Sequence, residues 1–228
     1  MALGRVKPGW YVLGALGVGL AVWFGAAPLA RRMSFFQVRR VEFAGLRYGA
    51  PRTTLAALRI PRSLSVFDDL KPIERRAKAL PGVNRARVGR RLPATLRVEL
   101  EEREPVALTP SAAAMRLIDA RGRLLPFDPS RSAPDLPVAE TPDVLVAQLL
   151  SRVQALDPEL FERVASARRE QDDVVLDIGG KSLRFRPDAS LEDMHLVTAV
   201  EAQLAREGKS YRELDGRFAG QVIVRGGA

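Results

Sequence analysis

The sequence predicts an α+β protein in which a single transmembrane helix precedes two folded domains. Three observations predict it: an uncharged apolar stretch of 23 residues at 8–30, short amphipathic segments of strand and helix periodicity in the rest of the chain, and a composition of 46% hydrophobic and 28% charged residues that is typical of folded proteins. We expect a short tail at 1–9, the helix at 10–32, a β-α-α-β-β domain at 33–104 and, at 105–228, a mixed α+β domain with an extended antiparallel sheet.

The uncharged stretch is long enough to cross a bilayer as one helix, for which about 20 apolar residues suffice. Trp10 and Trp23 lie toward its two ends, where amphipathic rings favour the membrane interface. A cleaved signal peptide is the competing interpretation, but its apolar region is usually only about 7–15 residues long, and Pro28 fits a small-residue cleavage site poorly. An uncleaved anchor is therefore favoured.

The orientation of this anchor is not decided by charge. Arg5 and Lys7 flank one end and Arg31 and Arg32 the other, so the positive-inside rule leaves both topologies open. A nine-residue tail is too short to fold, so the functional mass follows Arg32 in either topology.

The net charge of +9 is concentrated in the domain that follows the anchor. Residues 31–104 hold 18 Lys and Arg against 8 Asp and Glu, whereas residues 105–228 hold 16 against 19. A basic excess next to a membrane lies within reach of anionic lipid headgroups. Anionic lipid is therefore a candidate partner of the membrane-proximal domain, and nucleic acid is not expected to be one.

The apolar periodicity of residues 35–104 predicts five elements. A half-buried strand ends at Gly45, and two strands at 83–91 and 94–103 are joined by a turn at Leu92-Pro93. Between them lie a short helix at 53–58 and a second helix at 72–80 that Pro81-Gly82 ends. Two helices can cover one face of such a three-stranded sheet, whose exposed edges would invite pairing with another chain.

Residues 105–228 mix both periodicities. Strands are expected at 106–109, 115–118 and 123–125, and a hairpin at 174–186 turns across Gly179-Gly180. A proline-rich loop at 126–142 leads into a helix capped by Thr141, and a second helix begins at Ser190 with Asp193 as its capping-box partner and ends near Gly208. Residues 161–170 are ambiguous. Two last strands, 211–214 and 218–225, are expected to flank a turn at Asp215-Gly216.

No constellation of residues indicates catalysis, a cofactor or a metal. The chain has no cysteine, which excludes thiolate nucleophiles and zinc–thiolate sites, and its one histidine, His195, is expected to lie on a helix surface. The acidic pairs at 68–69, 101–102 and 172–173 have no neighbouring histidine and no metal-ligand spacing, so we interpret them as solvated turns and strand faces.

Several motifs resemble the FtsQ/DivIB family of bacterial cell-division proteins, and the first domain resembles a POTRA domain. They are VEFAG at 41–45, LPGV at 80–83 with Ala86 and Val88, RRLPATLRV at 90–98 and EREPVA at 102–107. LID at 117–119 with Gly122, LPV at 136–138, and Asp215 with Arg217-Phe218 resemble parts of the family's second domain. The resemblance covers most of the chain and is weakest between 141 and 209.

The resemblance implies a non-enzymatic scaffold of the division complex with partners of the FtsB and FtsL type. It implies an amino-terminal tail in the cytoplasm, one helix in the cell (inner) membrane, a body outside the cytoplasm, and concentration at the division septum. The family's last strands are implicated in binding FtsB by strand addition. The corresponding partner-binding residues here are Arg217, Phe218, Gln221, Val222, Ile223 and Val224.

Two other functions compete with the scaffold. One is a POTRA-bearing component of protein export or envelope assembly, which would be expected to carry a β-barrel or repeated modules that the sequence does not show. The other is a membrane-tethered enzyme, which would require the clustered acid, base or metal residues that are not found.

Overall fold

The computed structural model describes residues 34–112, 114–132 and 135–226. The expected tail and transmembrane helix, 1–9 and 10–32, lie outside these residues. Within the described ranges, no helix combines the length and the apolar character needed to cross a membrane. The described residues form two compact units, of which the first comprises 34–46 together with Ala50–Glu101, and the second comprises Arg47–Gly49 and the described residues from Glu102 onward.

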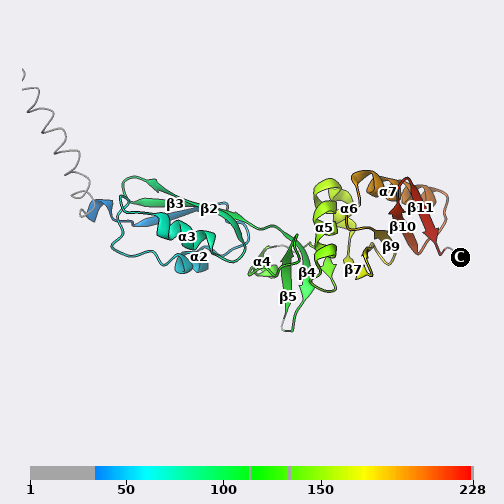
Figure 1. The fold of residues 1–228 in the computed structure, drawn as a ribbon, viewed down its shortest axis with the longest axis horizontal. Helices are drawn as coiled ribbons and strands as arrows, with labels where there is room; N and C mark the ends of the chain where they lie inside the picture. Colours follow the sequence, from blue (N-terminus) through cyan, green and yellow to red (C-terminus); the bar gives the residue numbers. More distant parts are fainter. Residues whose placement is uncertain (1–33, 113, 133–134, 227–228) are drawn as a thin grey trace, which may run out of the picture. The chain divides into compact units, whose positions relative to one another are not determined.

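The first unit has the β-α-α-β-β order that the sequence predicts (Figure 1). Its three strands form one sheet in the order β1-β3-β2, and β1 runs parallel to the central strand β3. A short 3-10 helix, η1, precedes the first strand. The elements are η1 (Ser34–Phe36), β1 (Arg40–Ala44), α2 (Pro51–Leu58), α3 (Lys71–Lys78), β2 (Val83–Arg91) and β3 (Thr95–Glu102).

The core of the first unit is formed largely by alternate side chains of β3. Leu96, Val98 and Leu100 are buried while the residues between them are exposed, because successive side chains of a strand point to opposite faces. They pack against Ile73 and Ala77 of α3 in one apolar cluster. The two helices therefore cover one face of the sheet, and the other face carries the charged residues.

The second unit is built on an eight-stranded sheet in the order β11-β10-β9-β8-β7-β6-β4-β5. Helices α5, α6 and α7 pack on one of its faces through a single large apolar cluster. The elements are β4 (Pro105–Pro110), β5 (Met115–Asp119), α4 (Pro129–Ser132), β6 (Val138–Ala139), α5 (Val144–Leu156), α6 (Pro158–Arg163), β7 (Ser166–Glu170), β8 (Asp173–Asp177), β9 (Ser182–Phe185), α7 (Leu191–Arg206), β10 (Glu213–Phe218) and β11 (Gln221–Arg225).

The extended sheet is mixed, and the prediction that it would be antiparallel is wrong in this respect. The pairs β4/β6, β6/β7 and β9/β10 are parallel. Two of these pairs are joined by helical crossovers, α5 and α6 between β6 and β7, and α7 between β9 and β10. A helical crossover returns the chain in the same direction, so the strands that it joins can pair in parallel.

The local predictions in this unit have mixed outcomes. The capping box of α7 is confirmed, since the Ser190 side chain accepts from the Asp193 N–H and the Asp193 carboxylate accepts from the Ser190 N–H. The cap of α5 is Asp143 and not Thr141, because the Asp143 carboxylate accepts the N–H groups of Leu145 and Val146. The expected strand at 123–125 is reduced to a single bridge between Leu124 and Ile118.

Candidate functional site

The last two strands form a hairpin whose turn differs from the prediction. β10 and β11 pair in antiparallel fashion, and the chain turns at Ala219-Gly220, where Gly220 has φ +71°. The predicted turn at Asp215-Gly216 is wrong, because both residues lie inside β10. Glycine favours a turn in an isolated sequence, but here the glycine in the left-handed conformation is Gly220.

Packing explains why Gly216 belongs to the strand. A Cβ atom at this position would lie 2.5 Å from Cγ2 of Val197 on α7 and 3.2 Å from Cε1 of Phe185 on β9. Both of these side chains are fully buried. Glycine is therefore required for the close approach of α7 to the sheet and not for a bend in the chain.

The strand β11 forms one edge of the eight-stranded sheet and is hydrogen-bonded to β10 alone among the described residues (Figure 1). Ile223 and Val224 are 42% and 45% exposed, and Phe218 at the end of β10 is 45% exposed. Gln221 is also exposed, whereas Val222 is half-buried and packs against the core. The hairpin thus presents main-chain groups and three large apolar side chains on its surface.

Arg217, the remaining predicted partner-binding residue, is engaged within the protein. Its guanidinium donates to both carboxylate oxygens of Asp215, at 2.8 and 2.7 Å, and to Oδ2 of Asp173 on β8, at 2.6 Å. The guanidinium carbon also lies 5.6 Å from the centre of the Phe218 ring. Arg217 therefore links β10 to β8 across the intervening β9, and its charge is paired within the protein.

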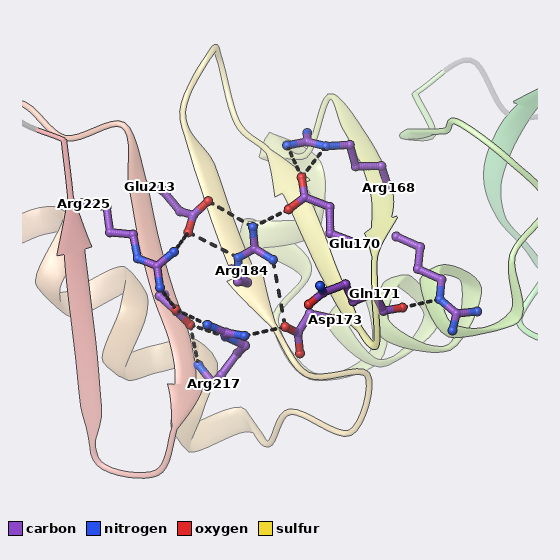
Figure 2. A network of polar contacts seen from close by, with 10 residues as sticks. Arg168, Glu170, Gln171, Asp173, Arg184, Glu213, Arg217 and Arg225 are labelled. Carbon is purple, nitrogen blue, oxygen red and sulfur yellow. Dashed lines mark hydrogen bonds and ion pairs between the residues drawn. The ribbon is translucent and has the colours of Figure 1, made fainter.

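Arg217 is part of an ion-pair network that crosses five strands on the sheet face opposite the apolar core (Figure 2). Arg184 on β9 pairs with Glu170, Asp173 and Glu213, and Arg225 on β11 pairs with Glu213 and Asp215. Four arginines and four carboxylates balance in charge: Arg168, Arg184, Arg217, Arg225, Glu170, Asp173, Glu213 and Asp215.

Sequence reasoning missed this network as a unit. It identified Asp215 and Arg217 only through their resemblance to a family motif, and it interpreted Asp173 as part of a solvated acidic pair. A usable signal was present, since charged residues at 213, 215 and 217 alternate with others in the period of a strand and so share one face. Their partners Arg184 and Asp173 come from distant segments and could not be assigned without the strand order.

Asp215 is the most enclosed member of the network, with no exposed surface. Burial alone would raise the pKa of its carboxyl group, but hydrogen bonds from the side chain and main chain of Arg217, together with the charges of Arg217 and Arg225, hold the pKa below the ordinary 3.8. A carboxyl whose pKa is lowered by folding stabilises the folded state above its unfolded pKa, and this stabilisation is lost as the pH falls through the folded pKa.

We therefore predict a pH-dependent difference in stability between the native protein and the Asp215→Asn variant. The native protein is expected to be the more stable at neutral pH, and the gap in free energy of unfolding should narrow once the pH falls below 3.8. Urea unfolding of both proteins from neutral to acidic pH measures it. A gap that stays constant through the acidic range would show that the Asp215 charge contributes nothing.

The other acidic pairs also have structural roles. Within the second unit, Oε2 of Glu102 accepts the N–H groups of Arg47 and Tyr48 at 2.6 and 2.7 Å, and Oε1 accepts that of Gly49 at 3.0 Å. In the first unit, Asp68 accepts the N–H of Ser65. The interpretation of these pairs as merely solvated is therefore too simple, because Glu102 and Asp68 accept hydrogen bonds from main-chain N–H groups.

The described residues contain no group of three histidine, cysteine, aspartate or glutamate residues that could hold a metal ion. His195 lies on the exposed side of α7. A shallow pocket of about 580 Å³ beside α5 is lined in part by Gln148, Arg152 and Asp188. Among the described residues, the candidate functional site is therefore the terminal hairpin, which combines an edge strand, exposed apolar side chains and the ion-pair network.

The chain matches known proteins along most of its length. Residues 36–103 match the family model of the FtsQ-type POTRA domain. A cell division protein FtsQ from Rhodothermus marinus is 27% identical over 213 residues, which cover 83% of this chain and 77% of that protein. A cell division protein FtsQ from Zymomonas mobilis subsp. mobilis is 32% identical over 104 residues, which cover 45% of this chain and only 33% of that protein.

A solved structure is also similar. It is the major extracytoplasmic domain of the trans isomer of the bacterial cell division protein DivIB from Geobacillus stearothermophilus, with a TM-score of 0.34 and 16% identity. The match covers 46% of this chain and 96% of that domain.

Proposed function

Because the chain belongs to the FtsQ/DivIB family of bacterial cell-division proteins, we propose that it is a membrane-anchored scaffold that binds other division proteins through the edge strand β11. In this proposal residues 10–32 span the cell membrane, the tail 1–9 lies in the cytoplasm, and the domains 33–104 and 105–228 lie outside it at the division septum. Partners of the FtsB and FtsL type would bind at Phe218 and 221–224, with Arg217 in support.

The observation that carries this proposal is the one-sided pairing of β11. An edge strand leaves alternate N–H and C=O groups unpaired, and an extended segment of another chain can satisfy them by adding a further strand. Affinity then comes from main-chain hydrogen bonds. Selectivity comes from the side chains beside the edge, here Ile223 and Val224 on β11 and Phe218 across the turn.

The ion-pair network supports this function by fixing the edge. Arg225 of β11 donates to Glu213 at 3.2 Å and to Asp215 at 2.9 Å, so the outermost strand is tied to β10 by side chains as well as by its ladder. A strand that is ordered before binding loses less conformational entropy when a partner pairs with it. The network thereby favours binding without contacting the partner.

Proline substitution tests strand addition. In an antiparallel pair, successive N–H groups of an edge strand point alternately toward its neighbour and away from it. Of the variants Ile223→Pro and Val224→Pro, one should therefore lose a bond to β10, and the other should lose only an outward donor. Thermal unfolding distinguishes them. The variant with near-native stability is expected to lose about tenfold or more in affinity for the FtsB/FtsL-type partners of the same bacterium.

A matched control lies at the opposite edge of the same sheet. Met115 of β5 is exposed on an edge strand, so Met115→Pro introduces the same residue into a similar context far along the strand order. It should leave co-purification of the partners unchanged. Equal partner binding by native protein and the stable β11 variant, or equal loss in Met115→Pro, would contradict strand addition at β11.

A further inference from the structure

Three segments of the first unit meet at the end from which β1 starts. We call this end the amino-terminal pole and define it as residues 34–40, 62–68 and 90–95. The N–H of Val38 donates to the carbonyl of Leu64 at 2.8 Å, and the N–H of Arg39 donates to the carbonyl of Ala94 at 2.9 Å. Arg90 adds a side-chain bond from Nε to the carbonyl of Val66. The pole is thus one continuous surface.

Large apolar side chains are exposed at this pole. Leu92, in the turn between β2 and β3, is 62% exposed and Phe35 is 55% exposed, the two highest values among the large hydrophobic residues that the structure describes. Phe35 is held in place by edge-to-face contact with Phe36, which in turn contacts Phe67, at ring-centre distances of 5.1 and 4.9 Å. More than half of the surface of Phe35 and of Leu92 is therefore left uncovered by the first unit.

The same pole is basic. It carries five arginines, and Asp68 is its one carboxylate. Asp68 accepts the N–H of Ser65, and Arg91 reaches Glu42 of β1 at 3.0 Å. Arg40 and Arg62, both exposed, form no ion pair with the described residues. A surface that combines exposed apolar side chains with excess cations suits the boundary between anionic headgroups and acyl chains.

The sequence brings this pole next to the expected anchor. Phe35 follows Ala30, the last residue of the uncharged stretch, by only five positions, and Arg31 and Arg32 lie between them. Five residues span at most about 18 Å when fully extended, so a pole that begins at Ser34 has little freedom to leave the membrane surface.

We propose that the amino-terminal pole rests on the membrane, with Leu92 and Phe35 inserted at the interface and the surrounding arginines on anionic phospholipid headgroups. This inference rests on the proposed anchor at 10–32, and it assigns a defined face of the domain to the lipid. The contact would fix how the domain leaves the bilayer. Among the described residues of the first unit, one further large apolar side chain is exposed: Leu55 on α2 lies outside the pole and serves as a reference.

The absence of cysteine from the chain allows a direct test. The full-length variants Phe35→Cys, Leu92→Cys and Leu55→Cys each take one environment-sensitive fluorophore and are reconstituted into vesicles of phosphatidylcholine with or without phosphatidylglycerol. In anionic vesicles, the labels at 35 and 92 should shift to the blue and be quenched several-fold by brominated acyl chains. The label at 55 should stay unquenched.

A charge variant tests the role of the arginines. Arg40→Glu added to Leu92→Cys should weaken the quenching in anionic vesicles, since each cation near such a surface contributes roughly a fivefold gain in association. Arg87→Glu is the matched control, because Arg87 is an exposed arginine in the middle of β2 without an ion pair to the described residues. It should leave the quenching unchanged.

The possible failures are distinguishable. A chain that does not float with vesicles after an alkaline wash would refute the anchor, and this inference with it. A chain that floats while its label at 92 behaves like the label at 55 would refute the lipid contact and leave the anchor and the scaffold intact. Equal quenching in neutral and anionic vesicles, unaffected by Arg40→Glu, would overturn the assignment to anionic headgroups.

Discussion

Replacing Asp215 by alanine is expected to lower the free energy of unfolding of the second unit by about 3 kcal/mol. The carboxylate has no exposed surface and accepts charged hydrogen bonds from Arg217 and Arg225. Its removal leaves two guanidinium groups with fewer partners on β10 and β11 and opens space beneath them. We expect a loss of stability at the lower end of the range for broken buried ion pairs, because the two arginines are partly exposed, Arg217 to 26% and Arg225 to 48%. Arg217 also keeps its contact with Asp173, and Arg225 keeps its contact with Glu213.

Urea unfolding followed by circular dichroism measures this effect, and Asp172→Ala provides the control. Asp172 is 99% exposed and reaches Arg169 only at 3.5 Å, so its loss should change the stability by less than about 0.5 kcal/mol. Equal stabilities of the two variants would mean that the network does not stabilise the hairpin. The supporting role proposed for it in partner binding would then be lost as well.

Replacing Gly45 by alanine is expected to destabilise the first unit by about 3–5 kcal/mol. A Cβ at this position would lie 2.1 Å from the carbonyl oxygen of Leu100 in the central strand, a distance that no side-chain rearrangement can relieve. Gly45 also has φ +78°, which alanine adopts only with strain. The residue ends β1 and lets the chain cross closely over β3, so main-chain atoms would have to move.

The variant Gly179→Ala separates the steric overlap with a neighbouring atom from the strain of a positive φ. Gly179 has φ +67°, but apart from its chain neighbours no atom lies within 4 Å of the position that a Cβ would occupy. Only the backbone strain therefore remains, and about 1–2 kcal/mol should be lost. Calorimetry of the two variants measures the difference. Comparable losses would show that the close approach to Leu100 is relieved at no cost in the folded protein.

The elements of the first unit could be predicted from the sequence because their signals are local. Alternation of Leu96, Val98 and Leu100 defines the inner face of a strand, and Pro81-Gly82 ends a helix regardless of what surrounds it. The capping box of Ser190 and Asp193 is local in the same sense, since both hydrogen bonds form within one turn. Each of these predictions is confirmed.

The predictions that failed concern residues with distant partners. Asp215 and Gly216 have the composition of a turn, but Arg225, Val197 and Phe185 determine their conformation. The cap of α5 is similar, since Thr141 and Asp143 are both suitable residues and Asp143 is also held by Arg169 of β7 at 3.2 Å. Local propensity is a weak guide where tertiary contacts of this kind compete with it.

By itself, the sequence determined the α+β class, the β-α-α-β-β order of the first unit, the basic excess of that unit and the motifs that resemble the FtsQ/DivIB family. The tertiary structure alone decided that β11 lies at the edge of the sheet, that Arg217 is committed to an internal network, and that Phe35 and Leu92 share one pole. The reason is physical: periodicity and caps act within a few residues, whereas strand order and charge pairing depend on contacts between segments far apart in the chain.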